Sequence, residues 1–390
     1  MDPRVVLYIE PATGEGGSGR SLMLLSEQLP EDRYLPIVAG AQDPCWLSEE
    51  TINRGFEYHG QYLAPWLPAH VGWREFARLP NRINSVRRLS NLIRSNNVAL
   101  VHTNSVATLD GAMAAKITGV PHIWHVRDQL DNPDHHRLFG GTAPSVRLLA
   151  DLGDLTIAVS GPARHPFTQL KRPGRLVTIP NATSIPDLLP RESLNDIRER
   201  LQIPSDSLVV GIVGMLIDRK GQGDLLEAVR LLEPEFPTLH VMVVGSAHEG
   251  YDQTLKDQAA TLKRPKNIHL LGRQGDVLSL MQAMDVMTQP SWSEGFGRTV
   301  IESMASATPV VASRVGGMIE SVDDGVTGLL VPPKNPQALA DALGSLLSQP
   351  DRAHEMGQAG RKKAAELYAP DNHAQMVCAA YDDLLGSSCR

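Results

Sequence analysis

The chain has 390 residues, a length that favours two domains, each large enough to bury a core of its own. Hydrophobic residues make up 42% of the chain and charged residues 21%, which excludes a disordered protein, and the net charge of −7 argues against a general nucleic-acid-binding role. Cys45, Cys378 and Cys389 show no paired spacing, so we expect a reducing compartment, no disulfide framework and no structural zinc site.

The N-terminal residues run straight into an apolar strand. No basic region precedes a long apolar core there, so we expect no signal peptide. The longest apolar run, residues 208–217, is too short to cross a bilayer and suits a strand buried on both faces. We therefore expect a cytoplasmic protein, or one attached peripherally to the inner face of a membrane.

Short apolar runs alternate with helix-like stretches along the whole chain. In the first half, the runs predicted to be strands are 5–10, 34–40, 98–105, 121–128, 155–161 and 175–182. In the second half they are 208–216, 239–245, 267–272, 285–291, 308–313 and 328–333. Strands separated by helices of this length indicate βαβ units and parallel sheets.

The two halves meet in a segment rich in proline, serine and charge, so we place the joint near 183–205. The predicted fold is α/β, with two Rossmann-like, doubly wound parallel-sheet domains facing across a cleft. Their expected bounds are 1–185 and 186–370. Residues 371–390 show amphipathic helical spacing, and we expect this last helix to cross back onto the first domain.

The most informative segment is EGFGRTVIESMASATPVVASRVGG, residues 294–317. Glu294 precedes a flexible turn of Gly295, Phe296 and Gly297, and Glu302 stands about one helical turn further on. Uncovered backbone N–H groups at a helix start favour a diphosphate. Ionised carboxylates accept hydrogen bonds from hydroxyls, so two of them can hold sugar hydroxyls on either side of that phosphate. This pattern predicts a site for a sugar–diphosphate–ribose ligand.

A second glycine-rich turn, TGEGGSGR at 13–20, follows the first predicted strand. Gly16 and Gly17 would let the backbone approach an anionic group ahead of a helix. The turn is not a Walker A loop and lacks strict G-x-G-x-x-G spacing, so a purely structural turn is the alternative.

His125 ends a predicted strand, where its imidazole would face the cleft and bond a sugar hydroxyl or phosphate. A packing histidine is the alternative. Arg127 beside it and Asn104 at the end of another strand are candidates for acceptor binding, although ordinary polar strand-end residues would look the same. His122 and His125 would point to opposite faces of a strand, so we expect no metal site.

Arg219 and Lys220 lie in a loop between a predicted strand and a helix. Two cations there suit a diphosphate and would balance charge on a leaving group, whereas solvated loop charges are the alternative. Arg273 could flank a nucleobase by stacking its planar guanidinium.

Residues 73–94 hold six arginines and a single acidic residue, with Trp66, Trp73 and Phe76 nearby. One interpretation is a basic amphipathic surface that meets anionic lipid or a lipid-linked acceptor. The other is a solvated helix face packed beside the strand at 98–105.

Taken together, these motifs resemble the retaining GT-B glycosyltransferases of family 4, also called the glycosyltransferase group 1 family. The resemblance rests on GEGGSGR, VHTNS, the histidine strand, the IPN joint, the lysine–glycine loop, LGRQGDV and QPSWSEGFGRTVIESMASATPVVASRVGGMIE. It implies metal-independent, cofactor-free transfer of a sugar from a nucleotide-diphosphate donor to a glycan or lipid-linked acceptor in cell-surface polysaccharide, lipopolysaccharide or glycolipid biosynthesis.

The resemblance also implies roles for individual residues. Glu302 would bind the ribose, and Glu294 with the backbone of 295–297 would hold the donor sugar. Lys220 would bind the diphosphate, His125 would contact the donor sugar, and the glycines at 16 and 17 would approach the phosphates or the acceptor.

One position departs from the family pattern. Met215 stands where the family usually has an arginine, five positions before the lysine. Either Arg219 supplies the charge or the diphosphate is held more weakly. Two other functions stay open, a sugar-nucleotide epimerase of the same fold and a catalytically degenerate nucleotide-sugar-binding partner.

Overall fold

The computed structural model describes residues 2–12, 16–63, 65, 73–132, 141–172 and 174–387, without the side chains of residues 73–79, 191, 192 and 387. The chain divides into two compact units. Unit 1 is Met1–Ala182 with Pro370–Arg390, and unit 2 is Thr183–Ala369. The boundaries expected from the sequence were 1–185, 186–370 and 371–390.

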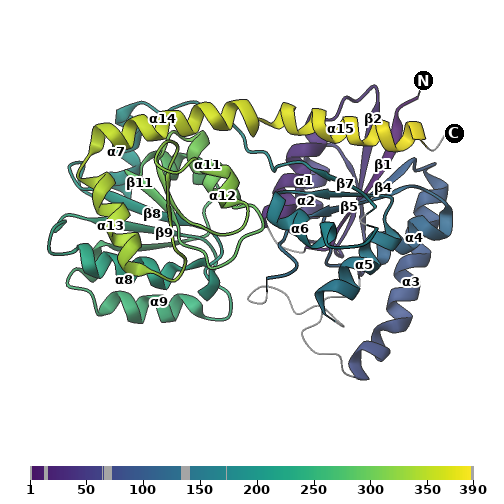
Figure 1. Ribbon diagram of the computed structural model, residues 1–390, viewed down its shortest axis with the longest axis horizontal. Helices are drawn as coiled ribbons and strands as arrows, with labels where there is room; N and C mark the ends of the chain where they lie inside the picture. Colours follow the sequence, from purple (N-terminus) through teal and green to yellow (C-terminus); the bar gives the residue numbers. More distant parts are fainter. Residues whose placement is uncertain are drawn as a thin grey trace. The chain divides into compact units, whose positions relative to one another are not determined.

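Unit 1 is built on a parallel sheet of seven strands in the order β3-β2-β1-β4-β5-β6-β7 (Figure 1). The strands are β1 (Arg4–Glu10), β2 (Tyr34–Gly40), β3 (Glu57–Gly60), β4 (Leu100–Thr103), β5 (His122–Val126), β6 (Leu155–Ala158) and β7 (Arg175–Thr178). The helices are α1 (Gly17–Gln28), α2 (Trp46–Asn53), α3 (Trp73–Ser95), α4 (Asp110–Thr118), α5 (Thr142–Leu152), α6 (Gly161–Thr168) and α15 (Pro370–Ser387).

Both faces of this sheet are covered, which explains why its strands read as continuous apolar runs. Val6 and Tyr8 of β1 pack in one cluster with α1 and with Val377 and Tyr381 of α15. Alternate residues of β1 pack in another cluster with α3 and α4. The amphipathic spacing of the last helix also assigned Met376 to its apolar face, but this side chain is exposed.

Unit 2 is built on a parallel sheet of six strands in the order β10-β9-β8-β11-β12-β13. Its strands are β8 (Val209–Val213), β9 (His240–Val244), β10 (Ile268–Gly272), β11 (Val286–Gln289), β12 (Val310–Ser313) and β13 (Leu329–Val331). Its helices are α7 (Arg191–Arg200), η1 (Asp218–Lys220), α8 (Gln222–Leu232), α9 (Tyr251–Ala260), η2 (Pro265–Asn267), α10 (Val277–Gln282), α11 (Arg298–Ala305), α12 (Met318–Ser321), α13 (Pro336–Leu347) and α14 (Pro350–Leu367).

The strand order of unit 2 reverses direction between β8 and β11. The chain passes from β8 outward to β9 and β10, and then returns to place β11 on the other side of β8. Loops that leave two such strands at their carboxyl ends diverge, and open parallel sheets bind ligands at that point. The corresponding reversal in unit 1 lies between β1 and β4.

The two parallel sheets confirm the predicted α/β fold class of doubly wound domains. Strand β3 was not predicted. It is a four-residue edge strand, EYHG, whose residues are exposed or half-buried, so it carries no apolar run that a sequence pattern could reveal.

The basic segment at 73–94 forms most of α3. Val86, Leu89 and Ile93 are buried in the cluster beneath the sheet, whereas Arg87 and Arg88 are exposed. Trp66 and the side chains of Trp73 and Phe76 lie outside the described residues, so the predicted aromatic part of this surface is not seen. Of the helices described, none combines the length and the apolar character that a bilayer span requires.

Two glycines bring the carboxyl ends of β8 and β9 into close contact. Gly245 has a φ of +145°, and a Cβ built on it would lie 1.8 Å from the carbonyl oxygen of Gly214. The backbone at the end of β8 can approach β9 this closely only because Gly245 carries no side chain, since a Cβ at Gly214 would meet no atom within 4 Å. This contact fixes the start of the loop that leads to Lys220.

We expect Gly245→Ala to destabilise the protein by about 3 kcal/mol, because the added methyl group must displace backbone. Gly250→Ala is the matched control: its φ of +78° is also positive, but no atom lies within 4 Å of the added Cβ. That substitution should cost about 1 kcal/mol. Equilibrium urea unfolding of both variants measures the difference, and equal losses would contradict the proposed clash.

Candidate functional site

The strongest candidate site lies where the strand order of unit 2 reverses. The loop after β8 carries Arg219 and Lys220 within η1, and the loop after β11 carries Glu294 before α11 begins. Trp292 N–H donates to the carbonyl oxygen of Arg219 at 2.8 Å, which ties the two loops together through their backbones. Gly221, with a φ of +76°, lies so close to Pro290 that a Cβ would stand 2.2 Å from its carbonyl oxygen.

A buried carboxylate and an ammonium group form the centre of the site. Lys220 Nζ donates to Glu294 Oε1 in an ion pair, with side-chain exposures of 17% and 11% respectively. Ser291 Oγ also donates to this oxygen at 2.9 Å, and Gln289 Nε2 lies 3.3 Å from it. Three side chains therefore contact this one carboxylate oxygen, from the loop after β8, from the end of β11 and from the loop after β11.

The charge of Glu294 depends on its neighbours. Burial acts to raise the pKa of this carboxyl, but the ammonium of Lys220 and the guanidinium of Arg219 outweigh burial, so its pKa is lowered below the ordinary value. Glu294 is consequently ionised at neutral pH and accepts hydrogen bonds only.

The turn of residues 295–297 leads into α11. Gly297 is the N-cap residue, with a φ of +84°, and no side chain caps the helix start. A Cβ at Gly316 would stand 1.6 Å from the carbonyl oxygen of Glu294, so the chain after β12 passes directly beside this turn. Phe296 is buried, and its ring packs edge-on against Tyr368 with centroids 5.8 Å apart. Only the backbone of Phe296 is available for the predicted donor contact.

Glu302 lies in the second turn of α11 and is 7% exposed. Arg298 Nη2, one turn earlier, donates to Glu302 Oε1 at 2.9 Å. The pair follows the i, i+4 spacing that brings side chains together on one helix face. Sequence reasoning missed Arg298, although the four-residue spacing was a usable signal.

The remaining candidates of unit 2 occupy other strand ends. Arg273 follows β10 at the edge of the sheet and is exposed. Arg219 Nη1 lies 3.5 Å from the carbonyl oxygen of Ser293, so it approaches the loop that carries Glu294. Met215, where the family pattern has arginine, is 50% exposed, and its carbonyl oxygen accepts a 3.0 Å hydrogen bond from Gln222.

A second polar cluster lies beside these loops, and no sequence pattern predicted it. Trp292 Nε1 donates to Asp224 Oδ2 at 2.7 Å, and Lys334 Nζ lies 4.5 Å from the centroid of the indole ring. The indole links α8 to the loop after β13, and only the three-dimensional structure brings these three residues together.

In unit 1, the structure joins Asn104 and Arg127 to each other. Arg127 Nε donates to Asn104 Oδ1 at 3.1 Å, and its Nη1 donates to Asn181 Oδ1. The Asn104 amide in turn donates to the carbonyl oxygen of Ser18 at 2.9 Å and to the carboxylate of Glu10. The two predicted acceptor-binding residues thus belong to one network at the carboxyl ends of β1, β4 and β5.

Gly16 and Gly17 stand at the start of α1, where Gly16 is the N-cap residue and no side chain caps the helix. Gly14, from the same predicted loop, lies outside the described residues. His125 on β5 is fully buried, and its imidazole belongs to a separate hydrogen-bonded chain. Among the residues that the structure describes, no three His, Cys, Asp or Glu side chains gather as a metal site would need.

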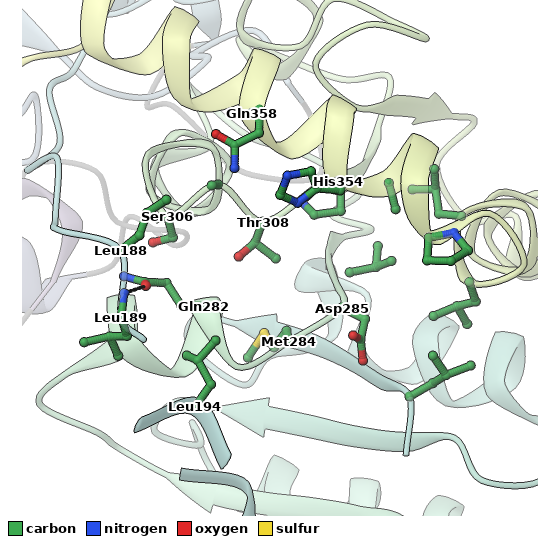
Figure 2. A pocket seen from close by; sticks show the side chains of 18 residues that line it. Leu188, Leu189, Leu194, Gln282, Met284, Asp285, Ser306, Thr308, His354 and Gln358 are labelled. Carbon is green, nitrogen blue, oxygen red and sulfur yellow. Dashed lines mark hydrogen bonds between the residues drawn. The ribbon is translucent and has the colours of Figure 1, made fainter. Parts of the chain in front are cut away.

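A separate cavity of about 290 Å³ lies at the amino ends of the strands of the unit 2 sheet, away from the candidate site (Figure 2). Leu208, Asp285 and Pro309, which precede β8, β11 and β12, help to line it. Several of its polar groups are already bonded: Gln282 accepts from Leu189 N–H at 2.7 Å, and Asp285 pairs with an arginine. Its lining is otherwise largely apolar, so it does not suit a charged nucleotide.

Comparison with known proteins gives matches along most of the chain. A model of the family "Glycosyltransferase Family 4" matches residues 15–185, and a model of "Glycosyl transferases group 1" matches residues 194–363. A D-inositol 3-phosphate glycosyltransferase of Corynebacterium urealyticum is 36% identical over 194 residues, which are 48% of this chain and 46% of that protein. The chain thus spans less than half the length of this relative.

A protein of the same name from Streptomyces scabiei is 27% identical over 83% of this chain and 67% of its own. Among solved structures, Anabaena HepE in complex with UDP and glucose superposes with a TM-score of 0.81, at 22% identity, over 97% of this chain and 99% of that one. This likeness shows a shared fold, which is the GT-B architecture. The two family models together match most of the chain, and each match falls on one of the two parallel-sheet units. The chain belongs to the family 4, or group 1, glycosyltransferases.

Proposed function

We propose that the protein transfers a sugar from a nucleotide-diphosphate donor to an acceptor hydroxyl, with retention of configuration at the anomeric carbon and without a metal ion. One observation carries this proposal. Two buried carboxylates, Glu294 and Glu302, flank a helix start that no side chain caps, at the strand-order reversal of unit 2, and Lys220 stands beside the first of them.

Each group in this arrangement has a defined task in the proposal. The backbone N–H groups at the start of α11 and the ammonium of Lys220 hold the diphosphate. Lys220 has three N–H donors, so it can bond a phosphate oxygen while it keeps its bond to Glu294. The carboxylate of Glu302 accepts from the ribose hydroxyls, and that of Glu294 accepts from hydroxyls of the donor sugar.

The chemical step breaks the bond between the anomeric carbon and the diphosphate oxygen. Negative charge then grows on the diphosphate, and Lys220, Arg219 and the helix start stabilise that charge more strongly than they stabilise the intact donor. The acceptor oxygen bonds to the same face of the sugar, and its proton passes to the leaving phosphate. These fixed positive groups do the work that a divalent cation would otherwise do.

The relatives favour particular substrates. The Anabaena structure contains UDP and glucose, which supports a UDP-sugar as the first donor to test. The Corynebacterium and Streptomyces relatives are named for D-inositol 3-phosphate, a polyhydroxyl compound, which supports a hydroxyl acceptor. Glycans and lipid-linked sugars present the same chemical group, so cell-surface glycan synthesis remains part of the proposal, with Asn104 and Arg127 near the acceptor.

We expect at least one of UDP-, GDP- and ADP-glucose to raise the melting temperature, because a ligand that binds only the folded state stabilises it. Glu302→Gln should weaken binding of that donor by about 10- to 100-fold, since it removes a charge-assisted hydrogen bond worth about 1.5–3 kcal/mol. Isothermal titration calorimetry measures the change.

Glu355→Gln on α14 is the control for this substitution, because Glu355 is exposed and lies on another helix. Its donor affinity should equal that of the wild type. Equal affinities for Glu302→Gln and Glu355→Gln would contradict a ribose-binding role for Glu302.

We expect Lys220→Met to lose about 3 kcal/mol of stability at pH 7, because it leaves a buried carboxylate unpaired. Glu294 has a lowered pKa in the wild type, so the ionised form is stabilising above the ordinary pKa, and that stability is lost as pH falls through the lowered value. Without Lys220, burial raises the pKa of Glu294, so this carboxyl group becomes protonated as the pH falls. Protonation removes the unpaired buried charge that destabilises the variant. Its deficit relative to the wild type should therefore be smaller at pH 5 than at pH 7 in urea unfolding.

The double variant Lys220→Met with Glu294→Gln removes the carboxylate as well, and its deficit should not change between these two pH values. A deficit of the single variant that grows on acidification would show that Lys220 does not set the charge state of Glu294.

The stereochemical course and the metal requirement are testable together. With a donor that binds and an acceptor sugar, we expect nucleoside diphosphate release that EDTA does not alter, and NMR of the product should show the anomeric configuration of the donor. Inverted product, or loss of activity with EDTA, would overturn the corresponding part of the proposal. Conversion of the free nucleotide sugar without acceptor would indicate an epimerase, and binding without turnover would indicate a degenerate binding protein.

A further inference from the structure

A continuous chain of buried polar side chains crosses unit 1. Tyr8 on β1 bonds Tyr381 on α15 through their hydroxyl groups at 2.8 Å. The Tyr381 hydroxyl lies 2.6 Å from Nδ1 of His102 on β4, and Nε2 of His102 lies 3.1 Å from Nδ1 of His125 on β5. All four side chains have no solvent exposure. Each link can therefore be assigned a donor and an acceptor without a role for bulk water.

One cation fixes the direction of this chain. Arg127 Nη2 lies 3.4 Å from Nδ1 of His125. A guanidinium is always protonated and can only donate, so Nδ1 of His125 must be an acceptor. Burial and the nearby guanidinium lower the pKa of His125 well below its ordinary value, so the ring is neutral. A neutral imidazole with a bare Nδ1 carries its proton on Nε2.

The protonation of His125 determines the donor and the acceptor in each preceding hydrogen bond. His102 must donate from Nε2 to reach an accepting Nδ1 on His125, and burial also lowers the pKa of His102, so its own Nδ1 is bare. That nitrogen accepts from the Tyr381 hydroxyl, and the Tyr381 oxygen accepts from Tyr8. Every link is satisfied in this direction.

The opposite direction fails at the Arg127 end, because it would place an N–H of His125 against a guanidinium that can only donate. Each direction leaves one buried donor without a partner among the described residues: His125 Nε2 in the assigned direction and the Tyr8 hydroxyl in the opposite one. The contact with Arg127 therefore decides between the two directions.

We propose that Tyr381 and His102 are positioning residues, which lock His125 in the tautomer that presents an Nε2–H donor. This Nε2 atom is buried and has no hydrogen-bond partner among the described residues. Resting on the proposed function, the inference assigns that N–H to an oxygen of the donor sugar or its phosphate.

The tautomers are tested directly in the ligand-free protein by ¹⁵N NMR of histidine-labelled chain. We expect the two-bond correlations to identify protonated Nε2 and bare Nδ1 on both His102 and His125, with the resonances assigned by His102→Gln and His125→Gln. Protonated Nδ1 on either ring would overturn the proposal. This measurement needs no nucleotide sugar, so its outcome stays readable if the proposed function fails.

Two tyrosine variants provide the functional test. Tyr381→Phe removes the donor to His102, whereas Tyr8→Phe removes one buried hydroxyl and the same tyrosine–tyrosine bond but leaves the Tyr381 donor in place. Tyr381→Phe should weaken the tautomer preference and raise KM for the donor by about tenfold, the loss expected for one buried hydrogen bond, with a smaller change in kcat. Tyr8→Phe should stay within about twofold of the wild type. Equal effects of the two variants would overturn the positioning role, and NMR of each variant shows whether its tautomers moved.

Discussion

A single buried ion pair imposes the main constraint on the candidate site. Glu294 loses water on burial, and an isolated carboxylate would become neutral there, so its charge depends on Lys220. Because the lysine belongs to the loop after β8 and the carboxylate to the loop after β11, the pair joins the two loops that diverge at the strand-order reversal. The requirement to pair a buried charge thus shapes both walls of one site, and it leaves a cation beside an uncapped helix start.

Two glycines of unit 2 allow the main chain to pack closely around this ion pair. Gly221 and Gly316 have positive φ values, and a Cβ at either would stand within about 2.2 Å of a carbonyl oxygen, at Pro290 and at Glu294 respectively. Backbone segments can therefore pass close on both sides of the carboxylate loop.

Much of the fold and part of the site were predictable from the sequence. Continuous apolar runs marked the buried strands, because a parallel sheet covered on both faces needs apolar residues throughout. The spacing of Glu294 and Glu302 around a glycine turn marked the candidate site. The pairing of Glu302 with Arg298 followed a helical spacing and could have been seen. In contrast, the contact of Tyr381 with His102 joins residues 279 positions apart, and no local pattern reports such a contact.

In each unit, a permanently charged side chain determines the hydrogen-bonding role of a buried ionisable side chain. In unit 2, a permanent cation keeps a buried carboxylate ionised, so the carboxylate can only accept hydrogen bonds. In unit 1, the permanent cation Arg127 faces one nitrogen of a buried imidazole, so the other nitrogen can only donate. Acceptors suit sugar hydroxyl protons, and a donor suits a sugar or phosphate oxygen.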